Sequence, residues 1–429
     1  MRNLILQVAL DFVDLDRAIK LADEAVEGGA DWLEVGTPLI KSVGMDAIRK
    51  LKEKFHNIPI VADMKTMDVG RIEVEMAAKA GAHIVSILGA AHISTIAECI
   101  EAGKHFGAKI MVDMLEVRNY VEVAKKIEEL GADYVSLHIP IDEQMLGKIS
   151  FENVKAVASA VNIPVAIAGG LNSENIVDAI KAGATILIVG GAITKSKDAV
   201  KATREIKEVM RTLVGIKTEL YTRVSEEKIM DVLKKVSVAN ISDALHRAPV
   251  LHSLRPLFEN IKMVGRAYTV RTYPGDWAKP VEAIDLAKPG DVLVIDAGGS
   301  PIAIWGELAT HSAIRKGLAG VVINGGVRDT MEIRVLKFPV FAKYITGQAG
   351  EPKGFGEVDV PVVIDSIRVE PGDYVIGDDD GVVVLPKGKA VEYANRAMDV
   401  LERENRIRQE IQNGGTLGEV TELLKWEKK

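Results

Sequence analysis

Ile60-Val61-Ala62-Asp63-Met64-Lys65-Thr66-Met67-Asp68-Val69-Gly70 is an apolar strand that runs directly into three charged residues spaced Asp-x-Lys-x-x-Asp. A buried strand usually ends in turn residues such as glycine, asparagine or proline. This strand ends instead in two carboxylates and an ammonium, which are costly to bury without partners. We interpret the cluster as part of a functional site; the alternative is a salt-bridge network that closes the end of a strand.

The same kind of strand recurs along the first half of the chain, with amphipathic helical segments between the strands. Several of these segments end in Gly-Ala just before the next strand, where glycine supplies the left-handed residue that stops a helix. Eight strand-helix units with strands this apolar predict a closed parallel (β/α)8 TIM barrel rather than an open doubly wound sheet. The expected strands are Leu4 to Leu10, Trp32 to Val35, Ile58 to Ala62, His83 to Leu88, Lys109 to Val112, Tyr134 to His138, Val165 to Ala168 and Thr185 to Val189.

Polar residues gather at the carboxyl ends of these strands, which is where such a barrel carries its chemistry. One polar residue at a strand end means little, but a ring of polar residues at the same end of the barrel indicates a functional site rather than ordinary solvent-exposed residues. The ring consists of Asp11, Glu34, Asp63, Lys65, Asp113 and His138.

Two glycine turns follow the last two strands, Gly169-Gly170 after the seventh and Gly190-Gly191 after the eighth. Glycines let backbone N–H groups approach an anion closely, and these loops are the usual phosphate site of a TIM barrel. The turns therefore predict a phosphorylated substrate. Each turn alone is also compatible with a tight connection into a helix.

Composition limits the classes of protein to consider. The chain has 429 residues, which suits two domains, and we place the boundary near Val214-Gly215, giving domains 1–213 and 214–429. A net charge of -7 gives no basic footprint for nucleic acid. We also find no apolar run long enough to span a membrane and no secretory signal at the N-terminus. The single cysteine, Cys99, lies in an apolar helical pattern, so we expect a buried thiol in a reducing cytoplasm.

The Asp-x-Lys-x-x-Asp motif of Asp63, Lys65 and Asp68 resembles the signature of the orotidine monophosphate decarboxylase superfamily. Within that superfamily, residues 1–212 most resemble the 3-hexulose-6-phosphate synthases, through Leu6 to Asp11, Glu34 to Pro38 and Val189 to Ile193. The resemblance implies an aldehyde-lyase that joins formaldehyde to ribulose 5-phosphate, or runs the reverse cleavage, with Mg²⁺ or Mn²⁺. It also implies a dimer, because in that family the aspartate matching Asp68 reaches the active site of a neighbouring subunit.

The chemistry of an aldol reaction agrees with these residue types. Glu34 and Asp63 offer hard oxygen ligands for Mg²⁺, which could stabilise an enediolate. Lys65 would stabilise the developing oxyanion. Its rival role is a Schiff base, which we disfavour because two nearby carboxylates should keep the amine protonated.

The other residues of the ring have roles in proton transfer and substrate binding. His138 is the candidate proton shuttle, although a histidine that ends a strand can equally be a packed core residue. Asp11 would bind sugar hydroxyls, and Asp113 is a weaker candidate for the same substrate. The nearest rival activity is that of 3-keto-L-gulonate 6-phosphate decarboxylase, which shares the scaffold and the enediolate chemistry.

The second half has closely spaced strands, introduced by turns such as Glu370-Pro371-Gly372-Asp373, and one helix at Ile304 to Lys316. This rhythm predicts an α+β domain of sandwiched β-sheets and helices, of the swivelling β/β/α type. A charged helix at Lys389 to Gln412 closes the chain, for packing or oligomer contacts. The expected strands are Gly265 to Thr272, Asp291 to Asp296, Gly320 to Asn324, Val340 to Tyr344, Val362 to Asp365 and Gly381 to Leu385.

Residues 225–400 resemble the family that contains both the regulator of ribonuclease activity A and the class II 4-hydroxy-4-methyl-2-oxoglutarate aldolases, through Gly306-Glu307-Leu308 and Asn324 to Glu332. Arg328 offers a fork for a 2-oxoacid carboxylate, and Asp329 offers a ligand for a divalent metal. Together with Glu332 they favour a metal site. Two alternatives remain: a structural ion pair, and a regulator that binds a ribonuclease without catalysis. Assembly beyond a dimer would run through this domain.

Overall fold

The computed structural model describes residues 4–147, 150–218 and 221–421, and the chain divides into two compact units. The first unit comprises residues 1–144, 148–223 and 402–429, and the second comprises residues 145–147 and 224–401. The units thus divide the chain differently from a single boundary at residue 214. No helix in the described part of the chain is long and apolar enough to cross a membrane.

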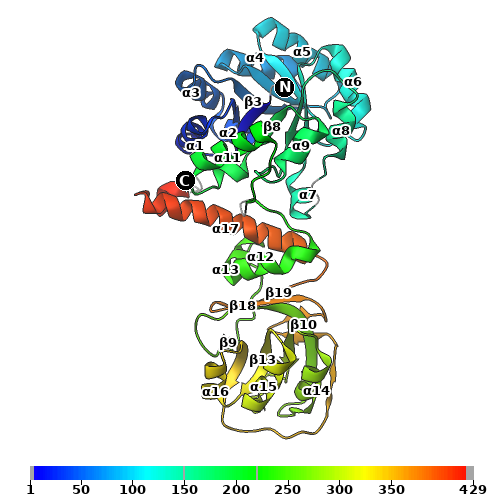
Figure 1. The fold of residues 1–429 in the computed structure, drawn as a ribbon, viewed down its shortest axis with the longest axis vertical. Coiled ribbons are helices and arrows are strands. Elements are labelled where there is room, and N and C mark those ends of the chain that lie inside the picture. Colours follow the sequence, from blue (N-terminus) through cyan, green and yellow to red (C-terminus); the bar gives the residue numbers. More distant parts are fainter. Residues whose placement is uncertain (1–3, 148–149, 219–220, 422–429) are drawn as a thin grey trace. The chain divides into compact units, whose positions relative to one another are not determined.

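The first unit is built on a closed barrel in which each strand pairs in parallel with its neighbours and β8 pairs back to β1 (Figure 1). This confirms the predicted TIM barrel, and the observed strands lie within a few residues of the expected ones. The eight strands are β1 (Ile5–Leu10), β2 (Trp32–Val35), β3 (Ile60–Thr66), β4 (Ile84–Leu88), β5 (Lys109–Asp113), β6 (Tyr134–His138), β7 (Val165–Ala168) and β8 (Ile186–Val189).

Helices cover the outside of the barrel, and several end in a left-handed glycine as predicted. Gly29, for example, has a φ of 99°, and its N–H bonds back to the last turn of α1. Gly81, Gly107, Gly131 and Gly183 end their helices in the same way. The helices of this unit are α1 (Leu15–Gly28), α2 (Thr37–Val43), α3 (Asp46–Lys54), α4 (Gly70–Ala80), α5 (Ile93–Phe106), α6 (Tyr120–Leu130), α7 (Ile141–Met145), α8 (Glu152–Ala158), α9 (Ile176–Ala182), α10 (Gly191–Thr194), α11 (Ala199–Thr212) and α18 (Leu417–Val420).

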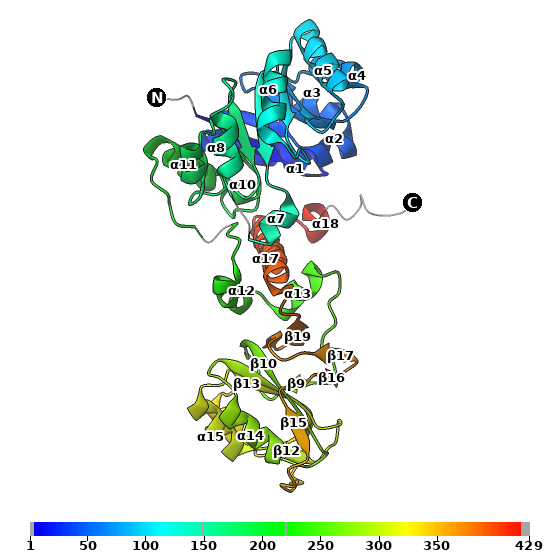
Figure 2. The same cartoon turned by 90° about the vertical axis from the view of Figure 1, so that its right-hand side faces the viewer.

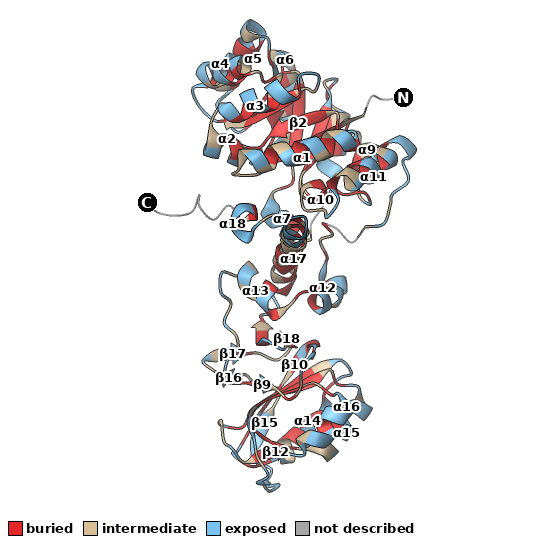
Figure 3. Cartoon of the chain, turned by 90° about the vertical axis from the view of Figure 1, so that its left-hand side faces the viewer, coloured by how far each residue is buried: buried red, intermediate tan, exposed pale blue. Residues whose placement is uncertain are grey.

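The barrel strands bury both of their faces (Figure 3). One set of side chains, including Leu6, Val8 and Leu33, packs outward against the helices. The alternate set, including Ala9, Val61 and Met111, fills the interior of the barrel. This two-sided burial explains why the strands read as continuous apolar runs.

β3 carries a bulge at the position of the motif. Asp63 pairs with Ser86 and Thr66 with Ile87, so the register shifts between them, and Lys65 has a φ of 50°. The strand therefore continues to Thr66, beyond the predicted end at Ala62. Bulges are found next to active sites, where they re-aim side chains.

The second unit contains a mixed sheet whose strand order is β19-β18-β10-β11-β13-β14-β9. Strands β10, β11, β13 and β14 run parallel to one another, and β9, β18 and β19 add antiparallel edges. Figure 2 labels β9, β10, β13 and β19 of this sheet. The strands are β9 (Arg255–Pro256), β10 (Met263–Thr272), β11 (Asp291–Asp296), β12 (Ala303–Trp305), β13 (Gly320–Val327), β14 (Val340–Ile345), β15 (Gly356–Val358), β16 (Val362–Ile364), β17 (Ile367–Val369), β18 (Tyr374–Asp378) and β19 (Gly381–Leu385).

Helices α14 (Ala278–Leu286), α15 (Glu307–Lys316) and α16 (Thr330–Leu336) connect the central strands of this sheet. Helices α12 (Ile229–Lys235) and α13 (Val238–Ala244) precede the sheet along the chain. The predicted second domain of β-sheets and helices is confirmed, and its main sheet is mixed, with parallel central strands and antiparallel edges. Helix α17 (Ala390–Gln412) closes the unit's sequence and contributes residues 402–412 to the first unit.

Candidate active site in the barrel

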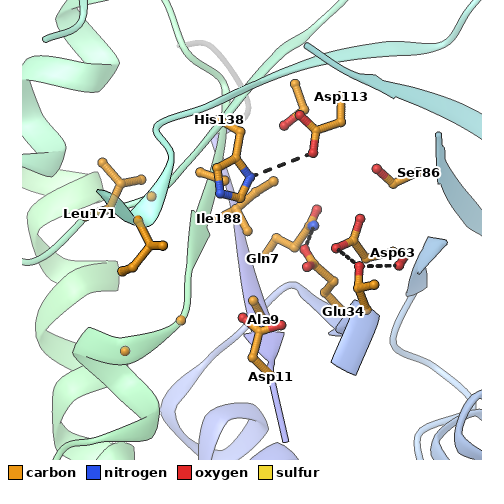
Figure 4. Close-up of a pocket in the computed structure, with 18 of the residues that line it drawn as sticks. Gln7, Ala9, Asp11, Glu34, Asp63, Ser86, Asp113, His138, Leu171 and Ile188 are labelled. Carbon is orange, nitrogen blue, oxygen red and sulfur yellow. Dashed lines mark hydrogen bonds and ion pairs between the residues drawn. The ribbon is translucent and has the colours of Figure 1, made fainter. Parts of the chain in front are cut away.

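A cavity of about 390 Å³ lies at the carboxyl ends of the barrel strands and receives side chains from all eight of them. Figure 4 shows Asp113 and His138 facing one another in this cavity, with Glu34, Asp63 and Gln7 gathered on another wall. The structure therefore brings the predicted polar ring together. The predicted residues that line it are Asp11, Glu34, Asp63, Lys65, Asp113, His138, Gly169, Gly170, Gly190 and Gly191.

Lys65 is held between two carboxylates. Its Nζ lies 3.0 Å from Asp63 Oδ1 and 2.6 Å from Asp113 Oδ2. Burial alone would lower the pKa of the Lys65 amine, but the charges of Asp63 and Asp113 outweigh burial and raise the pKa above its ordinary value. The amine is therefore protonated at neutral pH, which supports an electrostatic role over a Schiff base.

Asp113 joins Lys65 to the candidate proton shuttle. Nδ1 of His138 lies 3.7 Å from Asp113 Oδ2, and the backbone N–H of Leu115 donates to Asp113 Oδ1 at 3.0 Å. Burial would raise the pKa of the Asp113 carboxyl, yet the contacts with His138 and Lys65 hold the pKa below its ordinary value. Asp113 is thus a charged, buried residue that orients both a cation and an imidazole.

Glu34 is buried among other acids. Its pKa is raised well above the ordinary value, first by burial and then by the negative charges of Asp63 and Asp11. The side-chain amide of Gln7 donates a hydrogen bond to Glu34 Oε2, and Thr37 donates to Asp63 Oδ2 at 2.8 Å. The pKa of Asp11 is raised as well, by burial and by Asp63. Such a concentration of negative charge suits a bound cation.

The glycine turns after β7 and β8 form another part of the wall. Gly169 and Gly170 have φ values of 97° and 71°, and a Cβ on Gly169 would lie 2.4 Å from the carbonyl oxygen of Ile139. A side chain at this position is excluded by conformation and by space. The turns therefore present bare backbone to the cavity.

One motif residue lies elsewhere. Asp68 is exposed, its carboxylate accepts the N–H of Val69, and it is not among the described residues that line the cavity. The structure thus separates Asp68 from Asp63 and Lys65 within one chain.

Sequence reasoning missed several residues that line the cavity. Gln7, Ser86 and Ser136 are buried polar residues inside otherwise apolar strands, and that pattern was the available signal. Gln144 and Tyr221 come from segments outside the strands, and nothing in their local sequence marks them.

The second unit has its own cavity, of about 360 Å³. The predicted residues Gly306, Leu308, Arg328 and Asp329 line it, together with Trp277 and Trp305, which sequence reasoning missed. Asp329 Oδ2 accepts the N–H of Glu307 at 3.2 Å and lies 3.5 Å from Arg328 Nε.

Two predicted residues of this unit lie outside that lining. The Glu307 carboxylate is 3.4 Å from His311 Nε2 on its own helix, and Glu332 is exposed. In residues 4–147, 150–218 and 221–421, no group of three or more histidine, cysteine, aspartate or glutamate side chains is arranged to hold a metal. At Asp329, one carboxylate beside Arg328 offers oxygen ligands for a metal ion. In the barrel, the two carboxylates of Glu34 and Asp63 offer such ligands.

Comparison with known proteins matches each unit to a family. Residues 5–206 match the model of the Orotidine 5'-phosphate decarboxylase / HUMPS family, and residues 238–384 match that of the RraA-like family, described as Aldolase/RraA. A 3-hexulose-6-phosphate synthase from Bacillus subtilis is 38% identical over 206 residues, which are 48% of this chain and 98% of that protein. One from Staphylococcus epidermidis is 37% identical over 203 residues, covering 47% of this chain and 96% of that protein.

A solved structure of the RNA-processing inhibitor RraA from Thermus thermophilis is 32% identical, with a TM-score of 0.33, and covers 35% of this chain and 92% of its own. The closed barrel and the matches along nearly the full length of the synthases lead to one conclusion. The chain belongs, through its barrel, to the Orotidine 5'-phosphate decarboxylase / HUMPS family, as a relative of 3-hexulose-6-phosphate synthases, and carries an RraA-like domain as its second unit.

Proposed function

We propose that the barrel catalyses the aldol condensation of formaldehyde with D-ribulose 5-phosphate to D-arabino-hex-3-ulose 6-phosphate, or the reverse cleavage. The observation that carries the proposal is the position of Lys65, which contacts both Asp63 and Asp113 in the cavity that His138 also lines. The reaction removes a proton from C1 of the sugar and leaves negative charge on the enediolate oxygens. A fixed ammonium stabilises that charge without reorganisation.

His138 is the group that we assign to the proton at C1. Its contact with Asp113 orients the imidazole ring in the cavity, where the ring can accept the proton from the sugar. The new carbon–carbon bond then forms between C1 and formaldehyde as the π bond of the formaldehyde carbonyl breaks, and its oxygen takes up a proton to become the C1 hydroxyl of the product. The former C2 carbonyl becomes C3 of the product. The phosphate would lie against the glycine turns of residues 169–170 and 190–191.

We further propose that Mg²⁺ binds at Glu34 and Asp63. Mg²⁺ commonly takes one or two hard carboxylate ligands from a protein. The pKa of Glu34 is raised first by burial and then by the negative charges of Asp63 and Asp11, and a cation would offset those charges. When bound, the ion would supply further charge stabilisation for the sugar oxygens. Removing metal with a chelator should abolish turnover, and Mg²⁺ should restore it; turnover that survives chelation would contradict this part.

The test of the reaction is to mix the full-length protein with ribulose 5-phosphate, formaldehyde and Mg²⁺ and to measure hexulose phosphate. The same protein is given 3-keto-L-gulonate 6-phosphate in parallel. Formaldehyde-dependent product supports the proposal. Release of CO2 from the keto-gulonate without hexulose phosphate would establish the decarboxylase in its place.

We propose that the barrel acts as a homodimer in which Asp68 completes the neighbouring subunit's site. Support comes from the exposure of Asp68 and of the apolar residues that flank it, among them Met67, Val69 and Ile72. Mixing inactive Lys65→Ala with inactive Asp68→Ala protein should restore part of the activity, because a mixed dimer holds one intact site. Active Asp68→Ala protein on its own would contradict the proposal.

For the second unit, we propose cleavage of 2-oxoacid aldols. Arg328 lines the cavity there and can bind a carboxylate with two parallel hydrogen bonds. Pyruvate release that disappears in Arg328→Ala but persists in Arg368→Ala, an exposed arginine of the same unit, would support catalysis. Tight ribonuclease binding with no turnover would instead establish a regulator.

A further inference from the structure

Tyr221 belongs to the wall of the barrel cavity, although it lies beyond residues 5–206, which match the Orotidine 5'-phosphate decarboxylase / HUMPS family. Its side chain packs against the turn after β8. A Cβ added to Gly191 would lie 2.2 Å from Tyr221 Cε2, so the ring occupies the space that the missing side chain leaves. Tyr221 is only 8% exposed.

The position of Tyr221 is fixed at several points. Its N–H donates to Glu402 Oε1 at 2.5 Å, and its carbonyl oxygen accepts from Asn172 Nδ2 at 3.3 Å. Its hydroxyl lies 3.4 Å from Gln144 Oε1. The backbone has a φ of 55°, a conformation that a tyrosine adopts only when its surroundings determine it, and such residues cluster at functional sites.

Two cations lie beside the ring. The guanidinium carbon of Arg223 is 4.2 Å from the ring centroid, and Nζ of Lys195 is 5.2 Å from it. Arg223 forms a buried ion pair with Glu402 at 3.3 Å, and the two side chains are 0% and 3% exposed. Glu402 thereby holds both the backbone of Tyr221 and the cation stacked on its ring.

We propose that Tyr221 is a specificity-determining residue that closes the phosphate end of the barrel site, and that Glu402 and Arg223 are its positioning residues. The ring shares the cavity wall with the glycine turns of residues 169–170 and 190–191. By excluding water there, it strengthens the attraction between the anion and the backbone N–H groups. The inference rests on the proposed function, because it takes a sugar phosphate as the ligand.

The direct test is Tyr221→Gly, which removes the ring and suits the left-handed backbone. We expect KM for ribulose 5-phosphate to rise about 10-fold with little change in kcat, since uniform binding is lost. The matched control is Leu213→Gly, an exposed residue of the same unit with a φ of 56°, which should leave KM unchanged. A KM in Tyr221→Gly equal to that of the wild type, or equal effects of the two substitutions, would overturn the proposal.

A second variant tests the positioning residues. Glu402→Gln keeps the shape of the side chain but removes the charge that pairs with Arg223. We expect KM to rise in the same direction as in Tyr221→Gly, with kcat retained. A fall in kcat at constant KM would overturn this role.

Calorimetric titration of the full-length variants with ribulose 5-phosphate and with inorganic phosphate separates this inference from the proposed reaction. Weaker binding of both ligands by Tyr221→Gly than by Leu213→Gly supports the inference even if the wild type shows no synthase turnover. Absence of turnover would contradict only the proposed reaction. Undiminished binding of both ligands overturns the inference even if turnover is normal.

Discussion

Lys65 contacts two buried carboxylates at once, and this single side chain connects the electrostatics of the site to its chemistry. We expect Lys65→Ala to lower kcat by at least about 100-fold, because a preorganised charge at the enediolate is lost. The measurement is steady-state turnover, with circular dichroism to establish that the barrel is folded. Lys79→Ala, which removes an exposed lysine of α4, is the control. Near-normal turnover in Lys65→Ala would remove Lys65 from the mechanism.

His138 allows a test between its two roles, proton shuttle and packed residue. In His138→Asn we expect kcat to fall by about 100-fold to 10,000-fold, the usual contribution of a general acid or base. The decisive measurement is exchange of the C1 proton of ribulose 5-phosphate with D2O in the absence of formaldehyde. Exchange should be lost in the variant. If exchange persists while thermal stability falls, His138 is a packing residue.

Most of the barrel residues that line the cavity could be predicted from the sequence, because the carboxyl ends of all strands in a parallel barrel meet at one end of the barrel. The pairing within the ring was not predictable. Asp113 is predicted only as a substrate-binding residue, yet it contacts both Lys65 and His138, and only three-dimensional distances show this. Tyr221 was missed because its contacts to Asn172 and Glu402 join residues far apart in the sequence.

At the scale of elements, the loop between β10 and α14 is held by one buried carboxylate. Asp276 is 0% exposed and accepts the N–H groups of Ala278, Lys353 and Phe355 at 2.8–3.0 Å. Burial would raise the pKa of Asp276, but these backbone hydrogen bonds outweigh burial and lower the pKa. The carboxylate thus joins two loops of the second unit.

We expect Asp276→Asn to lower the free energy of unfolding of the second unit by about 2 kcal/mol at pH 7, since charge-assisted hydrogen bonds are lost. Because the folded pKa is depressed, the stabilisation is fully present above the unfolded pKa of about 4 and is lost as pH falls through the folded value. The difference between wild type and variant should therefore shrink below about pH 4. Urea unfolding followed by the fluorescence of Trp277 and Trp305 measures it.

The control for this prediction is Asp285→Asn, which changes an exposed carboxylate of α14. It should leave the unfolding free energy nearly unchanged at every pH. A destabilisation by Asp276→Asn that is the same at pH 7 and pH 3.5 would contradict the assigned cause.

The elements that sequence reasoning misplaced have identifiable causes. β3 was expected to end at Ala62, but a bulge carries the strand on to Thr66, and a bulge has no clear local signature. Helix α14 was missed because Pro280 interrupts its pattern, although proline is tolerated in the first turn. The helix predicted from Ile304 begins at Glu307, because residues 303–305 form the short strand β12.

At the scale of the molecule, each of the two units is built from segments that are not consecutive in the sequence. The predicted boundary at residue 214 follows the point where the strand-helix rhythm stops. The structure instead assigns residues 402–421 to the first unit. Charged residues of α17 make buried contacts there with residues several hundred positions earlier, and helical periodicity cannot reveal partners at that separation.

Arg406 is the clearest of these residues. It is 4% exposed, its guanidinium binds both carboxylate oxygens of Glu24 at 2.9 and 3.1 Å, and its Nε donates to Glu410 at 2.7 Å. Arg17 lies 3.5 Å from the other oxygen of Glu410. The result is a buried network of alternating charges that fixes the end of α17 within the first unit.

We expect Arg406→Met to destabilise the first unit by about 3 kcal/mol, because the change keeps the apolar stem but leaves the buried Glu410 with Arg17 alone and removes the guanidinium from the partly buried Glu24. Arg408→Met is the matched control. It removes an exposed arginine one position beyond Ile407 on the same helix, and it should change stability by less than about 0.5 kcal/mol. The full-length variants are unfolded in denaturant, and the fraction of folded first unit is measured by the synthase turnover proposed for the barrel. Equal stabilities of the two variants would show that residues 402–412 add nothing to the stability of the first unit. A single boundary along the sequence would then describe the two domains.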